Sequence, residues 1–260
     1  MKKHATFFVC FVLMVLYGNA KDFPLKFSFG TGYNYYGSSD LKAAKGSYNE
    51  TYAGLLSRDF GAEGIPFYYE LGMKYALVDG FGMSLNYSFS RNNYGATFAG
   101  NGMQRHVTIR NRTPIDFGLY FGQPQKTCFE VRIGFYESTL VADVEYADGT
   151  RSISNMQAMN GTYHSFGFFY KADIAKRIIG PLSLKLGIGG GTTMGSHYND
   201  LSHAREVDLL STSWFPTDFA AYEIAVNNNT FYDYPDDRYW KGSYFQFYAG
   251  LQFNLIRGND

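Results

Sequence analysis

The sequence has no excess of charge of either sign. Its 23 Lys and Arg side chains are matched by 23 Asp and Glu, and charged residues make up only 18 % of the chain. A protein that holds a nucleic-acid backbone needs a basic surface, so this balance argues against a nucleic-acid partner. Hydrophobic residues reach 45 %, which excludes a disordered chain.

Long apolar runs and cysteines are also scarce. The run from Phe7 to Tyr17 is shorter than the ~20 residues of a membrane-spanning helix, and no later window is long enough. Two lysines precede this run and Gly18-Asn19-Ala20 follows it, which is typical of a secretory signal peptide cleaved after Ala20. We therefore expect residues 1–20 to be a signal peptide and residues 21–260 to form one exported domain. That domain keeps only Cys128, so no internal disulfide can form.

Aromatic residues are abundant, at 19 %, and 29 glycines accompany them. Three stretches alternate strictly between apolar residues and polar or small ones, over 65–77, 81–89 and 245–255. Side chains of a strand point alternately to opposite faces, so each stretch predicts a strand with one wholly apolar face. Five further segments fit the same pattern: 25–36, 107–122, 127–136, 163–175 and 182–190. The sequence therefore predicts an all-β protein of eight strands.

The predicted connections alternate between short and long. Residues 78–80, 123–126 and 176–181 form short turns, whereas residues 37–64, 91–105, 137–162 and 195–242 form long polar segments. This rhythm is typical of an antiparallel, up-and-down transmembrane β-barrel with short periplasmic turns and long extracellular loops. A secreted β-sandwich is the alternative. Strand length, the rhythm of the connections and the glycines on the polar faces argue against it.

The signal peptide, the eight alternating strands and the final strand ending Gly250-Leu251-Gln252-Phe253-Asn254-Leu255 resemble the small outer-membrane β-barrel proteins of Gram-negative bacteria. The OmpA-type barrel is the familiar example of this porin-like group. The chain's richness in Tyr, Phe and Gly is similar to that of members from the Bacteroidota. The resemblance implies insertion into outer-membrane lipid with the help of the barrel assembly machinery.

Strand parity places nine charged residues inside the predicted barrel. They are Lys26, Glu70, Lys74, Asp116, Glu130, Arg132, Lys171, Asp173 and Lys185. Folding the hairpins about their turns brings Asp116 near Arg132 and Asp173 near Lys185. Buried charges are tolerated when they are paired, and eight strands enclose little more than their own side chains. We expect a lumen closed by charged side chains in its periplasmic half. A small selective pore is the alternative.

The sequence gives weaker support for a catalytic site than for a closed lumen. Some enzymes of this membrane place Ser and His near the loops, and His106 and His197 share inward parity if their strands extend that far. No carboxylate to orient a histidine base is evident, so the chain is not expected to be an enzyme, and a lipid-modifying barrel remains the minor alternative. No metal-ligand spacing occurs, and no cofactor is expected.

The last long segment carries many aromatic residues, among which Trp214, Tyr222, Tyr234 and Trp240 are the candidate contacts. They would bind a surface protein or glycan, or else fold over the barrel mouth as a lid. The expected role is structural or interactive, as a monomer. The first alternative is passage of a small or apolar solute.

Overall fold

The computed structural model describes residues 25–123, 126–152, 161–197, 218–221, 224, 228 and 241–255. The signal peptide and its cleavage site lie outside the described residues. The strands are β1 (Leu25–Gly37), β2 (Leu56–Val78), β3 (Phe81–Phe98), β4 (Gln104–Gln123), β5 (Thr127–Glu145), β6 (Arg151–Ser152), β7 (Gly161–Ile179), β8 (Leu182–His197) and β9 (Tyr244–Leu255), and one helix, α2 (Ser39–Thr51), follows β1. No helix of the described part is long and apolar enough to cross a membrane.

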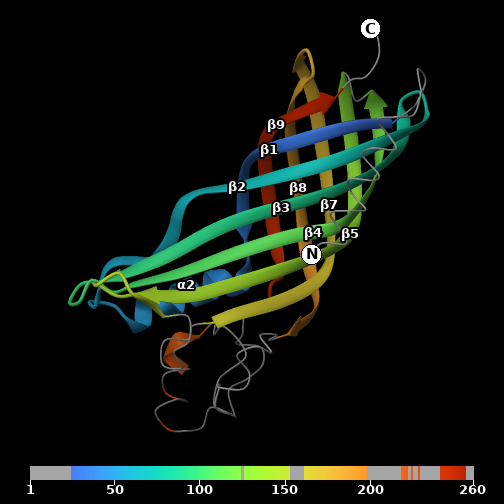
Figure 1. Cartoon of the computed structure of the whole chain (residues 1–260). Helices are drawn as coiled ribbons and strands as arrows, with labels where there is room; N and C mark the ends of the chain where they lie inside the picture. The colour runs from blue at the N-terminus through green and yellow to red at the C-terminus, as the bar shows by residue number, and fades with distance from the viewer. Residues whose placement is uncertain are drawn as a thin grey trace.

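Eight of these strands form a closed antiparallel barrel (Figure 1). Each strand pairs with the next along the chain, β1 pairs with β9 to close the ring, and the two-residue β6 only extends the hairpin at the end of β5. The predicted eight-stranded up-and-down architecture is therefore confirmed. Tight turns join β2 to β3 and β7 to β8, and Gly80, at φ +77°, provides the left-handed conformation that the first of them requires.

The predicted strand faces are also observed in the barrel. Along β2, Leu71 and Tyr75 are more than two-fifths exposed, whereas Glu70 and Lys74 are buried. The outer surface is therefore apolar and the interior is polar, the reverse of a water-soluble protein.

Strands β2 to β5 are longer than predicted and extend beyond the other strands at the end where α2 lies (Figure 1). The expectation of long polar loops over residues 37–64 and 91–105 was wrong, because most of these residues form α2 and the extensions of β2, β3 and β4. Asp148-Gly149 turns a hairpin in the following segment, where Val144 pairs with Ser152.

An apolar core joins α2 to the extended strands. The Ser38 hydroxyl caps the helix by accepting from the Leu41 amide, and Leu41, Ala44 and Tyr48 lie on its buried face. The Tyr48 ring packs against Phe60 at 5.3 Å and edge-on against Phe219 at 4.9 Å between ring centres. The chain therefore has a second packed layer beyond the barrel proper.

Candidate functional site

Eight charged side chains meet inside the barrel and form what we call the lumen charge network. Each is at most 5 % exposed, and they come from β2, β4, β5, β7 and β8. The members are Glu70, Lys74, Asp116, Glu130, Arg132, Lys171, Asp173 and Lys185. Four are acidic and four are basic, so their formal charges cancel.

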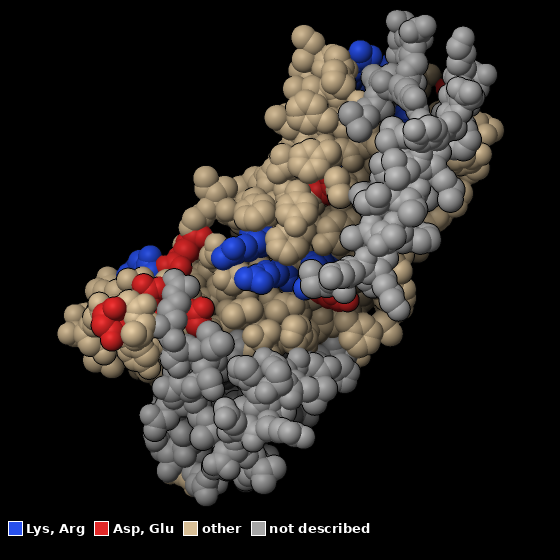
Figure 2. Space-filling view, in the orientation of Figure 1, with Lys and Arg blue, Asp and Glu red and all other residues tan. Residues whose placement is uncertain are grey.

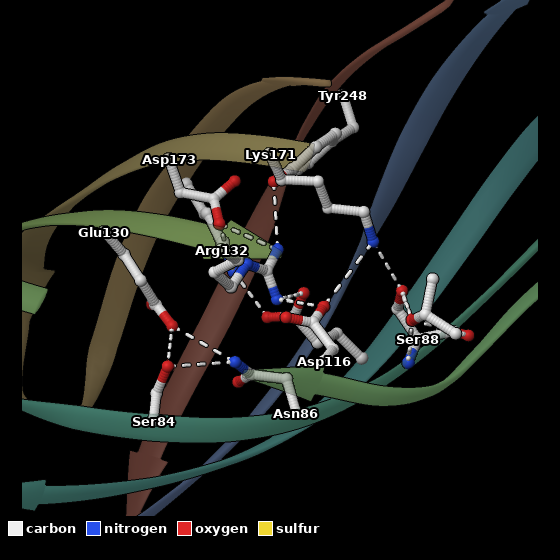
Figure 3. A network of polar contacts seen from close by, with 12 residues as sticks. Ser84, Asn86, Ser88, Asp116, Glu130, Arg132, Lys171, Asp173 and Tyr248 are labelled. Carbon is white, nitrogen blue, oxygen red and sulfur yellow. Dashed lines mark hydrogen bonds and ion pairs between the residues drawn. The ribbon is translucent and has the colours of Figure 1, made fainter. Parts of the chain in front are cut away.

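Arg132 lies at the centre of the network (Figure 3). Its Nη1 atom is 2.6 Å from Glu70 Oε2 and 3.0 Å from Asp116 Oδ2. Its Nη2 atom is 2.7 Å from Asp173 Oδ2 and donates to the Tyr248 hydroxyl at 3.0 Å. One guanidinium therefore contacts three carboxylates on three strands, which its planar set of five donors suits.

The three lysines neutralise the remaining carboxylate charge. Lys185 Nζ forms an ion pair with Glu70 and lies 3.6 Å from Asp173 Oδ2. Lys74 Nζ is 2.7 Å from Glu130 Oε2. Lys171 is placed by the Ser88 hydroxyl, which accepts at 2.7 Å, and lies 3.7 Å from Asp116 Oδ2. Every carboxylate of the network thus has a cation within 4 Å, as buried charges require.

Neutral polar side chains of β3 complete the contacts (Figure 3). Glu130 Oε1 accepts from the Ser84 hydroxyl and from Asn86 Nδ2, the latter at 3.1 Å. Ser84, Asn86 and Tyr248 were not among the predicted site residues. Their positions on the inward faces of β3 and β9 were the signal that would have identified them.

Glycines create the room that these long side chains need. A Cβ atom added at Gly118 would meet Ser84 Oγ and would lie 2.8 Å from Arg132 Cγ, and one added at Gly187 would meet Asp173 and Tyr248. The lumen at this level is filled by side chains to van der Waals contact.

A small space lies next to the network, lined by Asn34, Tyr68, Ser90, Lys171 and Tyr244 among others. The volume open to the centre of a water molecule is about 10 Å³, close to what one water requires. Asn34 is fully buried, and neither its amide nitrogen nor its amide oxygen has a hydrogen-bond partner in the described structure. Stacked rings of Tyr36 and Tyr244, 5.3 Å apart, lie in the same part of the lumen.

The ninth predicted charge, Lys26, is partly buried and lies opposite Lys74 in the register of β1 and β2. The four candidate aromatic contacts, Trp214, Tyr222, Tyr234 and Trp240, lie outside the described residues.

The prediction that His106 has inward parity was wrong. A bulge in β4, between Arg112 and Ile115, leaves Pro114 and Ile115 both exposed and reverses the parity of the strand beyond it. Val107 and Ile109 are therefore buried, and His106 lies on the outer face, with Nδ1 3.3 Å from Glu63 Oε2. Proline lacks the N–H that a ladder needs and is tolerated at a bulge, so Pro114 was the signal that sequence reasoning missed.

In the lumen, acidic and basic side chains neutralise one another's charges. Its carboxylates are all engaged with cations, which leaves none as an independent acid or base. Among the described residues, no group of three His, Cys, Asp or Glu side chains is arranged to hold a metal ion.

No protein-family model and no curated protein matches the sequence. Solved structures with a similar chain path include Ail, the attachment invasion locus protein of Yersinia pestis, crystallised with the heparin analogue sucrose octasulfate. That match has a TM-score of 0.43 at 8 % identity and covers 89 % of this chain and 97 % of Ail. The outer membrane protease OmpT from Escherichia coli has a TM-score of 0.38 at 12 % identity, covering 91 % and 98 %. This chain is a closed eight-stranded antiparallel β-barrel.

Proposed function

We propose that the chain is an outer-membrane β-barrel protein whose lumen is closed by side chains, and that it has a structural or surface-interaction role. The observation that carries the proposal is the apolar outer surface. All eight barrel strands contribute large apolar side chains that are at least 42 % exposed, among them Phe29, Leu71, Leu85, Phe121, Ile133, Tyr170, Ile188 and Leu251. A monomer in water rarely exposes so much contiguous apolar surface, whereas lipid solvates it.

Barrel closure supports the same conclusion. A sheet in lipid must pair all its backbone groups, because no water reaches an open edge. The β1–β9 pairing satisfies this requirement along eleven residue pairs, from Phe27–Leu255 to Gly37–Phe245. The predicted export signal at residues 1–20 is consistent with delivery to the outer membrane of a Gram-negative cell, as a monomer assembled by the barrel machinery.

The interactive part of the proposal rests on the region beyond the barrel. Helix α2 and the extended strands form a packed layer there, and the predicted contact residues Trp214, Tyr222, Tyr234 and Trp240 belong to the sequence segment between β8 and β9. We propose that this end binds a surface protein or a glycan. Replacing the four aromatic residues by serine should abolish binding of the nanodisc-embedded protein to a glycan array or a cell-surface protein panel.

The membrane proposal is tested by refolding residues 21–260 into phosphatidylcholine vesicles. A folded barrel resists unheated detergent, so we expect a band that migrates faster before heating than after, together with protection of the strands from added protease. A soluble β-sandwich would stay outside the vesicles and show no shift on heating.

A small pore for a small or apolar solute is the second candidate function, suggested by the polar and charged side chains of the lumen, such as Asn34 and Lys171. Discrete current steps from the refolded protein in a planar bilayer would favour the pore. A lipid-modifying enzyme is the third candidate, and loss of lipid hydrolysis or acyl transfer on changing His106 or His197 would favour it.

A further inference from the structure

Three arginines lie together on the outer surface of the barrel. Arg91 of β3 pairs directly with Arg110 of β4, and Arg112 lies two residues farther along β4 on the same face. Arg110 and Arg112 are exposed, and the Arg91 Nε donates to Asn93 Oδ1 at 3.0 Å. Basic side chains gather on the visible face over β3 and β4 (Figure 2). We call these three residues the arginine cluster.

The cluster lies where the outer surface changes from apolar to polar. On β4, the outward residues on the short-turn side of the bulge are Ile115, Phe117, Leu119 and Phe121, each more than a third exposed. On the other side, the outward positions are Arg112, Arg110 and Thr108. The neighbouring strands change at the same level, from Phe89 to Arg91 and from Phe135 to Glu137. In a bilayer this level is the boundary between acyl chains and headgroups.

The β4 bulge is what places the arginines there. It reverses the parity of the strand, so that Arg110 and Arg112 face outward while Ile109 and Asn111 are buried. A regular strand would have directed both arginines into the lumen.

The arrangement is unfavourable without an anion. Like charges directly opposite each other on neighbouring strands destabilise a sheet. No carboxylate of the described residues lies within ion-pair distance of any member of the cluster; Glu137 is adjacent to Arg112 in the register but is not within that distance. Guanidinium groups bind phosphate oxygens with two parallel hydrogen bonds, and their long stems can follow an apolar surface to the headgroup level.

We propose that the arginine cluster binds the phosphate of an anionic lipid headgroup at the outer rim of the barrel. The inference rests on the proposed membrane insertion and goes beyond it, because it assigns a specific lipid contact to one side of the barrel.

The test uses the refolded chain in neutral detergent, titrated with dioleoyl phosphatidic acid and followed by native mass spectrometry. We expect selective binding over phosphatidylcholine, and about thirtyfold weaker binding for Arg110→Gln/Arg112→Gln, since each arginine at an anionic surface contributes about fivefold. The control Lys42→Gln/Lys45→Gln removes two charges from the exposed face of α2 and should leave binding unchanged.

Equal binding by the arginine variant and the parent protein would overturn the inference. Full competition by inorganic phosphate at the same phosphorus concentration would also overturn it, since the site would then recognise a free anion. Each variant is first refolded into phosphatidylcholine vesicles, where insertion needs no anionic headgroup. Failure of the parent protein to give a heat-modifiable band there would overturn the proposed function and this inference with it, whereas a normal band with no lipid selectivity overturns the inference alone.

Discussion

Arg132 Nη1 lies 2.6 Å from Glu70 Oε2, although β5 and β2 are not neighbours in the barrel. The ion pair therefore crosses the lumen between two strands that are three apart in the ring of eight. The two side chains occupy space inside the barrel that an open channel would need. Their contact also fixes the distance between β2 and β5. Buried ion pairs add little net stability compared with a well-packed apolar interior, but removal of one partner is costly because its counter-charge is left buried and unpaired.

Arg132→Met should therefore destabilise the barrel by about 3–5 kcal/mol, because three buried carboxylates lose their shared cation. Urea unfolding of the vesicle-refolded protein, followed by the loss of the heat-modifiable band, measures this change. Arg58→Met is the control, since Arg58 is half exposed and its pair with Glu63 is worth at most about 1 kcal/mol. Equal unfolding midpoints for the two variants would contradict the central role of Arg132.

Gly118→Val should overpack the lumen and cost about 1–3 kcal/mol, because the new side chain meets Ser84 and Arg132. The same urea assay applies. Gly46→Ala on α2 is the matched control: a Cβ there has nothing within 4 Å, and the helix should gain up to about 1 kcal/mol. If Gly118→Val left the stability unchanged, the lumen would have free space at this level.

Tyr48→Ala should loosen the layer beyond the barrel while leaving the barrel intact. Tyr48 is 1 % exposed and packs on Phe60 and Phe219, so its truncation should cost that layer about 3–5 kcal/mol. We expect faster tryptic cleavage at Lys42 and Lys45 with an unchanged heat-modifiable band. Glu50→Ala, at an exposed position of the same helix, should cleave like the parent protein. Simultaneous loss of the band in Tyr48→Ala would show that the layer and the barrel unfold together.

An ordered water should occupy the space beside Asn34, because a fully buried amide without protein partners needs one. A high-resolution crystal structure should show it within hydrogen-bond distance of the Asn34 amide. Asn34→Leu, which keeps the branched shape but is larger and has no polar atoms, should then destabilise the barrel or leave its stability unchanged. An empty site together with a stabilising Asn34→Leu would contradict this expectation.

The alternation of apolar and polar residues predicted the barrel because each strand keeps this period of two over much of its length. In β2, for example, Glu70 is buried in the lumen and its neighbour Leu71 is exposed on the outer surface. The same parity assigned Arg132 and Asp116 to the lumen, but it could not predict the contact between Arg132 and Glu70. That contact depends on how far non-adjacent strands are shifted along one another in the barrel. The alternation pattern of a single strand contains no information about this shift. Beyond the bulge at Pro114 parity failed, and His106 was assigned to the wrong face. Helix α2 was missed because its apolar face, Leu41, Ala44 and Tyr48, is narrow within a polar segment.

The conductance of the refolded full-length barrel in a planar bilayer tests the closed lumen most directly. The parent protein, inserted as shown by its heat-modifiable band, should carry no steady current, because the lumen charge network fills the interior. Glu70→Ala/Arg132→Ala/Lys185→Ala removes the cross-lumen contacts with little net charge change and should produce discrete current steps if the variant inserts. Stable current steps from the parent protein would contradict the closed lumen and make a small pore the preferred function.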